Sequence, residues 1–321
     1  MAITGTGTQG DPYMVDSVAG LLQKVQESGV YIKITKDLDC YEEDTPWQSV
    51  KWCSKYVDGQ KHSIDNIYVY SECIVFDCQD GSIANITFNI TCDGLSRHVC
   101  LFRLSSTTGN SINSCNINLT MENIVDNVTI FDAWRDWYGF YNSKIKVILK
   151  GKNATLRILS IHNRYGYIRN SEFLVYAYEN EASIDEINMI YGDGSEIYVE
   201  KCRFKVNVPV CKRFHIFERY STGCQISSSY FIGDIGTNEA LFNETRGYSI
   251  VNSYIALKNH ESSVNISTNS PTDNRTTSYN AINTFVDTED TNIVPIGSFI
   301  GLTKAQCKDK DYLNSIGWYV K

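Results

Sequence analysis

The sequence predicts an all-β fold: a single-stranded, right-handed parallel β-helix, a solenoid with short capping helices at its N- and C-terminal ends. The first observation is a short sequence motif, called the phrase below, that recurs every 25 to 31 residues. It is usually an Asn or Ser, then two residues, then an apolar or aromatic residue that opens an alternating run. The phrases begin at Asn85, Ser114, Asn142, Asn170, Lys201, Ser227, Asn252 and Ile282. A drifting period of this size is typical of a repeat architecture.

The second observation is another short apolar run in each repeat, at residues 128–131, 156–161, 184–190 and 214–217. Both kinds of run are β-branched or aromatic and are bounded by turn-forming residues, so they predict strands. No repeat has apolar residues at helical spacing, which excludes helical repeats. A propeller blade needs about 40 to 45 residues, more than these repeats contain.

The N-terminal element expected first in the chain is a helix. Asp16 or Ser17 can cap it, Val18, Leu21, Leu22 and Val25 lie on one face, and Gly29 can stop it. A strand at residues 31–34 follows. We assign residues 1–60 to this N-terminal cap, because a solenoid otherwise exposes its core and unpaired strand edges at its ends.

The coils are expected over residues 61–299. In each of them an Asn at the turn tolerates left-handed backbone angles, and its amide can bond to the Asn stacked above it. Residues 265–277 are polar and predict a protruding loop. Residues 300–321 form the C-terminal cap, where Thr303 and Gln306 have the spacing of a capping box for a helix that runs to about Asn314.

Composition limits the possible partners. The net charge is −8, so the surface repels phosphates and nucleic acid is not an expected partner. No stretch is apolar enough to cross a membrane, and the N-terminus does not resemble a signal peptide, which indicates synthesis in a cytosol. The 11 cysteines include no CxxC pair, so we expect buried reduced thiols, with no metal and no cofactor.

The candidate binding residues form a stripe that follows the second run of successive repeats. Its members recur at intervals of 26 to 29 residues, and equal phase on a solenoid means alignment along its length. The stripe consists of Trp134, Arg135, Tyr138, Arg164, Tyr165, Tyr191, Arg219, Tyr220, Arg246 and Tyr248.

Tyrosine and tryptophan rings beside planar Arg donors suit a glycan, because sugars have apolar faces and hydroxyl groups. Two other interpretations remain open. The long side chains can cover a plain turn surface, or they can form a subunit interface, where Tyr, Trp and Arg are enriched.

Catalysis on a glycan requires two carboxylates about 5 to 10 Å apart. The candidates are Asp193 and Glu218, which lie on adjacent repeats, with Asp132 and Asp136 nearby. His162 and His215 are candidate proton carriers. No dense cluster of acidic residues suggests a calcium site.

The two termini resemble those of phage and prophage virion proteins with pectate-lyase-like β-helix domains. The opening Gly-Thr-Gly-Thr-x-x-Asp-Pro-Tyr-x-Val at residues 5–15 and the ending at residues 308–318 carry this resemblance. It implies a non-enzymatic virion protein, a tailspike, receptor-binding fibre or head fibre that adheres to host glycan. It also implies attachment through residues 1–60 and a homotrimer. Two alternatives remain open: a polysaccharide-degrading glycosidase or lyase, and a purely structural decoration protein.

Overall fold

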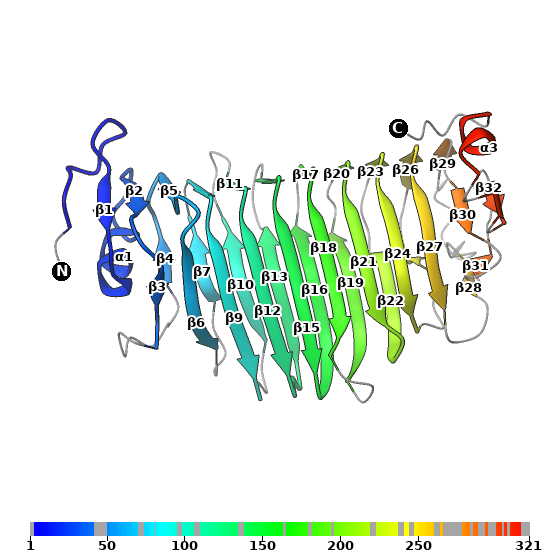
Figure 1. Ribbon diagram of the computed structural model, residues 1–321, viewed down its shortest axis with the longest axis horizontal. Helices are drawn as coiled ribbons and strands as arrows, with labels where there is room; N and C mark the ends of the chain where they lie inside the picture. The colour runs from blue at the N-terminus through cyan, green and yellow to red at the C-terminus, as the bar shows by residue number, and fades with distance from the viewer. Residues whose placement is uncertain are drawn as a thin grey trace.

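The computed structural model is a β-solenoid of parallel strands, as the repeats predict (Figure 1). The coils stack along the long axis, with α1 (Val18–Lys24) at one end and α3 (Lys310–Ser315) at the other. The structure describes residues 3–41, 50–69, 74–79, 81–94, 98–105, 110–133, 138–162, 165–178, 182–193, 196–218, 223–236, 241–243, 247–259, 264–265, 278–282, 285–287, 293–294, 300–303, 305–306 and 309–315.

Three long sheets form the walls of the solenoid. Sheet 1 contains β1 (Tyr13–Val15), β2 (Tyr31–Ile34), β5 (Tyr56–Asp58), β8 (Ser82–Ala84), β11 (Asn110–Asn113), β14 (Tyr138–Tyr141), β17 (Gly166–Arg169), β20 (Glu196–Glu200), β23 (Gly223–Ser227), β26 (Gly247–Val251) and β29 (Ser278–Ile282). Sheet 2 contains β3 (Leu38–Asp39), β6 (Ser63–Val69), β9 (Thr87–Asp93), β12 (Asn116–Glu122), β15 (Lys144–Lys150), β18 (Glu172–Ala177), β21 (Arg203–Val208), β24 (Tyr230–Ile235), β27 (Tyr254–Asn259), β30 (Phe285–Asp287) and β32 (Ile300–Leu302). Sheet 3 contains β4 (Val50–Trp52), β7 (Ile74–Cys78), β10 (Val99–Leu104), β13 (Asn127–Ala133), β16 (Lys152–His162), β19 (Ser183–Asp193), β22 (Cys211–Glu218) and β25 (Phe242–Asn243). A short pair, β28 (Val264–Asn265) and β31 (Ile293–Val294), completes the described strands.

The core lies between these sheets and is filled by side chains that repeat from coil to coil. Phe204 stacks on Phe173 with ring centroids 4.7 Å apart and on Phe231 at 4.6 Å. Phe76 stacks on Phe102 at 4.6 Å. Parallel strands in exact register place equivalent side chains above one another, so each aromatic ring packs against its counterpart in the next coil.

The turn from sheet 1 to sheet 2 contains the repeated phrase. In each described repeat its first residue has a positive φ of 49° to 57°; these residues are Asn85, Ser114, Asn142, Asn170, Lys201, Ser228 and Asn252. The predicted left-handed turn is therefore confirmed. The sixth phrase begins one residue later than predicted, at Ser228, because three consecutive serines obscured its boundary. Residues 283–284 of the last phrase lie outside the described residues.

Side chains at this turn bond along the axis in two rows. The Asn142 amide donates to Asn113 at 3.0 Å, and the Asn170 amide donates to Asn142 at 3.3 Å. One residue further along the turn, the buried Ser143 hydroxyl accepts from the backbone N–H of Cys115 at 3.0 Å and donates to the carbonyl of Tyr141 at 2.6 Å. The serine row satisfies backbone groups that the tight turn would otherwise leave unpaired.

A short helix lies near each end of the described chain, α1 and α3. Ser17 is the N-cap of α1, and its hydroxyl accepts from Gly20 N–H at 3.2 Å. The predicted capping box is confirmed, since Thr303 and Gln306 accept from each other's backbone N–H. A separate helix, α3, follows, and Asp309 accepts from Tyr312 N–H at its start. Pairing continues across the predicted boundary at residue 60, because β5 pairs with β8.

Three further predictions concern the cysteines, a loop and the handedness of the solenoid. The thiols of Cys115, Cys202 and Cys211 are reduced and buried, and burial raises the pKa of each to about 12. The predicted loop at residues 265–277 is outside the description beyond its first residue. The handedness of the solenoid stays a prediction.

We expect Asn142→Val to lower the free energy of unfolding by about 1 to 3 kcal/mol. A β-branched residue is strained at φ 50°, and the amide bonds to the neighbouring coils are lost. Urea unfolding followed by circular dichroism measures the change. The matched control is Asn207→Val on the exposed face of β21, which should change stability by less than about 0.5 kcal/mol. Equal effects of the two substitutions would contradict the role of the turn.

Candidate functional site

The predicted stripe lies where the chain leaves sheet 3 and enters sheet 1, but most of its side chains fall outside the described residues. This applies to Trp134, Arg135, Arg164, Arg219, Tyr220 and Arg246. Tyr138 and Tyr248 are placed by backbone position alone, at the starts of β14 and β26.

The two stripe tyrosines whose side chains are described differ in position. Tyr165 directly precedes β17 and is 43% exposed. Tyr191 lies within β19, in register with Ser160 and Glu218, and is buried. Equal spacing predicts a single aligned row. These two tyrosines instead occupy different positions in the coil, Tyr191 in sheet 3 and Tyr165 at the edge of sheet 1.

The outer face of sheet 3 is the most unusual surface of the molecule. Along β13, Thr129 and Asp132 alternate with core residues, yet both are buried. Between them two consecutive residues, Ile130 and Phe131, both join the core, and Ile130 drops out of the strand pairing. Two successive inward side chains break the alternation of a straight strand, from which we infer that the strand bends here. Polar residues on this face that are buried are Thr129, Asp132, Thr155, Ser160, Glu186, Asn188, Tyr191 and His215.

One part of this face is a histidine and carboxylate pair. The His162 Nε2 atom lies 3.2 Å from Asp132 Oδ1 and 3.0 Å from the Ser160 hydroxyl. Asp132 is almost fully buried. The structure thus brings together two of the predicted candidates, Asp132 and His162, on the adjacent strands β13 and β16.

Two arginines form the middle of the face. The Arg157 guanidinium lies 4.4 Å from the ring centroid of Tyr191, a cation–π contact. Its Nε atom is buried without a hydrogen-bond partner, and the same is true of Arg103 Nε on β10. The charges of both arginines act on His98, where burial is the main cause of a lowered pKa.

A carboxylate pair lies further along the face. Glu186 accepts from the Asn188 amide at 2.6 Å and pairs with Arg213 at 2.7 Å. Burial raises the pKa of Glu218 to about 7, and the charge and hydrogen bonding of Glu186 act in the same direction. Glu186 lies near the start of β19 and Glu218 at the end of β22, so the contact between these two carboxyl groups joins opposite ends of adjacent strands.

Unpaired polar atoms concentrate on this face. Among the described residues, eight buried side-chain nitrogen or oxygen atoms have no hydrogen-bond partner, and five of them lie here. They are Asp77 Oδ1, Arg103 Nε, Arg157 Nε, Asn188 Oδ1 and Glu218 Oε2. Buried polar groups are normally paired, so this concentration indicates a site for a polar ligand.

The other predicted catalytic residues are less fully placed. Asp136 lies outside the described residues. Asp193 is placed by its backbone, two residues beyond Tyr191, the register partner of Glu218. His215 is buried on this face. In the described part of the chain, no group of three His, Cys, Asp or Glu side chains is arranged to hold a metal ion.

Sequence reasoning missed Arg103, Arg157, Glu186 and Asn188. The available signal was the alternation of polar and core residues in the second strand of each repeat. It was weak because alternation normally indicates solvent-facing side chains, and the sequence does not show the bend.

Comparison with protein-family models, with curated proteins and with solved structures found no match. None of the helices that the structure describes is long and apolar enough to span a membrane.

The raised pKa of Glu218 predicts a pH-dependent stability. Its folded pKa, about 7, exceeds the ordinary value of 4.5, so the folded state holds a proton that the unfolded state releases between these values. The contribution of Glu218 to stability is therefore favourable at low pH and declines as pH rises through this window. Urea midpoints measured from pH 4.5 to pH 8 should show that Glu218→Gln removes part of this decline. A carbon NMR titration of Glu218 with a midpoint near 4.5 would contradict the prediction.

Proposed function

We propose that this protein is a non-enzymatic structural and adhesion protein of a phage virion that binds host surface glycan on the outer face of sheet 3. One observation carries the proposal: five buried, partnerless polar atoms gather on this face, and they include both donors and acceptors. Sugar hydroxyls donate and accept hydrogen bonds, so a glycan can satisfy both kinds of atom with one type of group.

The dimensions of the face also suit an extended chain. The five atoms belong to strands from β7 to β22, which are five strand steps apart in the sheet. At about 4.8 Å per step this row extends roughly 24 Å along the solenoid. The exposed ring of Tyr165 lies near the end of the same strands and offers an apolar surface to a sugar.

The assignment to a virion, the attachment through residues 1–60 and the homotrimer rest on the resemblance of the two termini. The β-solenoid supports them to the extent that an elongated, stackable fold suits a fibre or spike. A subunit interface on the predicted stripe is compatible with this assignment.

Arg157→Ala tests the binding proposal. We expect it to weaken binding to a bacterial surface polysaccharide about 10- to 100-fold, because a charged donor to the ligand is lost. The full-length protein is first screened on an array of such polysaccharides, and affinity is then measured for each retained glycan. The control is Arg169→Ala on sheet 1, which removes an Arg whose guanidinium instead pairs with Glu200. Unchanged affinity of Arg157→Ala, or an equal loss in the control, would refute the site.

A second candidate function, polysaccharide cleavage, is favoured by Glu218. A carboxyl group with a pKa near 7 holds a proton at neutral pH and can donate it to a leaving sugar oxygen. Asp193 is the candidate second carboxylate.

If cleavage occurs, Glu218→Gln should reduce oligosaccharide release at least about 100-fold while the glycan still binds, because the amide cannot donate the proton. Chromatography of the products measures release. If the unaltered protein binds the glycan but releases no oligosaccharide, the adhesion function is favoured. If it neither binds nor releases, a purely structural decoration protein is favoured.

A further inference from the structure

The C-terminal half of the outer face of sheet 2 is basic, opposite in sign to the net charge of the whole chain. Its strands from β15 to β27 carry six cationic residues that alternate with core residues: Lys144, Lys146, Lys150, Arg203, Lys205 and Lys258. The acidic residues in equivalent positions are Glu172 and Asp234. The chain as a whole has a net charge of −8, so this half of one face is a local basic surface.

Few of these cations are neutralised by neighbours. Glu172 is shared by two of them, at 2.9 Å from Lys144 and 3.1 Å from Arg203. Among the described residues, neither Lys146 nor Lys205 has a carboxylate partner. Lys205 instead lies 5.8 Å from the ring centroid of Tyr176. The uncompensated charge is therefore available to an external anion.

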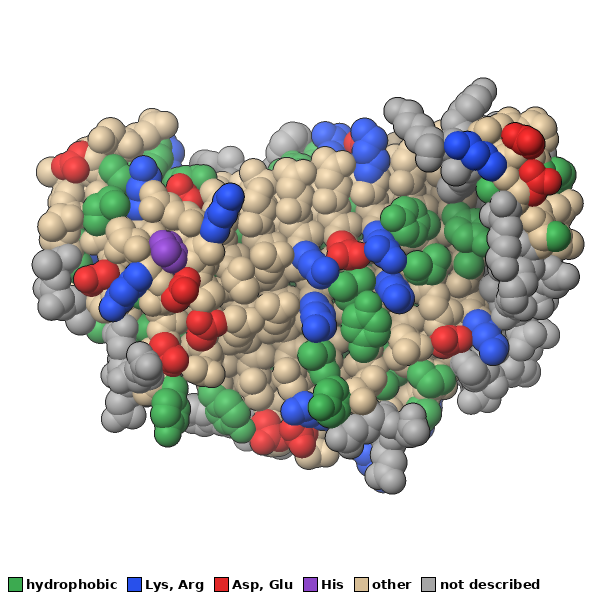
Figure 2. Space-filling view, in the orientation of Figure 1, with side chains coloured by type: hydrophobic (Ala, Val, Ile, Leu, Met, Phe, Trp, Pro, Cys, Tyr) green, Lys and Arg blue, Asp and Glu red, His purple; other side chains and the backbone are tan. Residues whose placement is uncertain are grey.

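Apolar side chains lie among the cations. Leu174 is the register partner of both Lys146 and Lys205 and lies between them, but its side chain is buried. The partly exposed apolar side chains are those of Tyr176 and Ile232. Ile232 pairs with Lys205 on its other side. Figure 2 shows basic side chains gathered around an apolar area near the middle of this face. The surface thus combines positive charge with flat apolar contacts.

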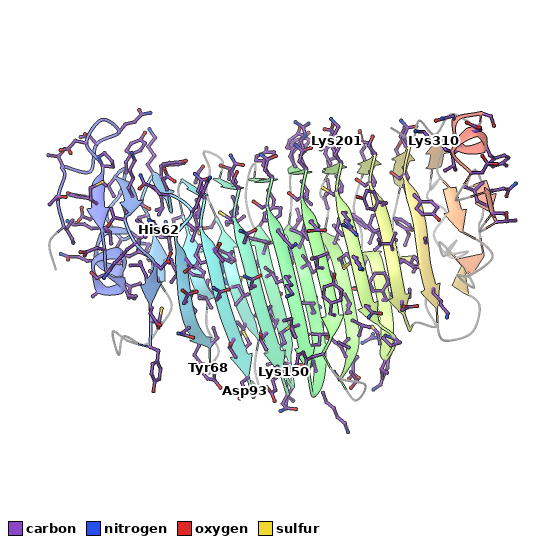
Figure 3. The ribbon with its side chains drawn as sticks, viewed as in Figure 1. His62, Tyr68, Asp93, Lys150, Lys201 and Lys310 are labelled. Atoms are coloured by element: carbon purple, nitrogen blue, oxygen red, sulfur yellow. The ribbon has the colours of Figure 1, made fainter. Side chains whose placement is uncertain are left out.

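The N-terminal half of the same sheet is acidic. Asp65, Asp93 and Glu122 lie on β6, β9 and β12. Asp93 and Lys150 lie along the same edge, where the strands of sheet 2 end (Figure 3). Charge therefore changes sign along the face, and a negatively charged polymer is attracted to the C-terminal half and repelled from the other.

We infer that the basic half of sheet 2 binds an acidic polysaccharide, whose carboxylates contact the lysines and whose sugar rings pack on the partly exposed Tyr176 and Ile232. Charge complementarity identifies the polymer as anionic, and the apolar area between the cations matches the apolar faces of sugar rings. This surface shares no residue with the proposed site on sheet 3.

The test uses the full-length protein with polygalacturonate as the probe and neutral dextran as its uncharged counterpart. Polygalacturonate should bind, with affinity that falls as salt rises, whereas dextran should not bind to this face. The double variant Lys146→Glu/Lys205→Glu should weaken polygalacturonate binding about tenfold or more. Lys51→Glu plus Lys36→Glu makes the same charge change at exposed sites elsewhere and should have little effect.

Three results would overturn the inference: equal binding of both polymers, an equal loss in the control pair, or stronger binding to phosphatidylglycerol vesicles than to polygalacturonate. Arg157→Ala separates this inference from the proposed function, because it should leave salt-sensitive polygalacturonate binding intact. Loss of polygalacturonate binding in Arg157→Ala with no loss in the sheet 2 variant would place the anion on sheet 3 and reject the basic surface.

Discussion

The left-handed turn between sheets 1 and 2 sets the register on which the rest of the solenoid depends. At this turn one residue of each described coil adopts a positive φ, and its backbone N–H bonds to the next coil, as in the 3.0 Å contact from Asn142 to the Arg169 carbonyl. Side chains alternate between core and surface along a strand, so a slip of one residue at the turn would exchange the two faces. The Phe173 and Phe204 stack and the outer faces of all three sheets follow from this one position.

The outer face of sheet 3 is a candidate site because many of its polar side chains are buried. Side chains such as Asp132 and Asn188 point away from the core, as alternation requires, yet both are buried. Burial strengthens each electrostatic interaction and makes an unpaired polar atom costly. A fold that tolerates Arg157 Nε and Glu218 Oε2 without partners on the same face is stabilised by other contacts, and a ligand that pairs them gains binding energy.

The repeat can be read from the sequence because Asn or Ser recurs at most of the turns where the backbone adopts a positive φ. Asn142 and Asn170 mark the turn, and Ser17 and Thr303 mark the caps, all through local hydrogen bonds. The candidate site was harder. The charges of Glu218 and Asp132 identify them as candidates from the sequence. Arg157 and Glu186 become candidates only because of their burial on this face, which local sequence does not encode. The predicted stripe assumes that equally spaced residues occupy the same position in every coil, which would align Tyr191 with Tyr165. Loop lengths differ between coils, so the two tyrosines occupy different positions.

The stacking of coils also has a mechanical consequence. Because strands of adjacent coils pair in parallel, the backbone hydrogen bonds between coils point along the long axis. Tension applied to one end of the chain loads the terminal coil first and detaches its strands one by one, whereas compression along the axis is shared by the whole stack. A solenoid built in this way resists axial compression better than detachment of its terminal strands. Its weakest points are its two ends, where α1 and the Thr303 capping box lie.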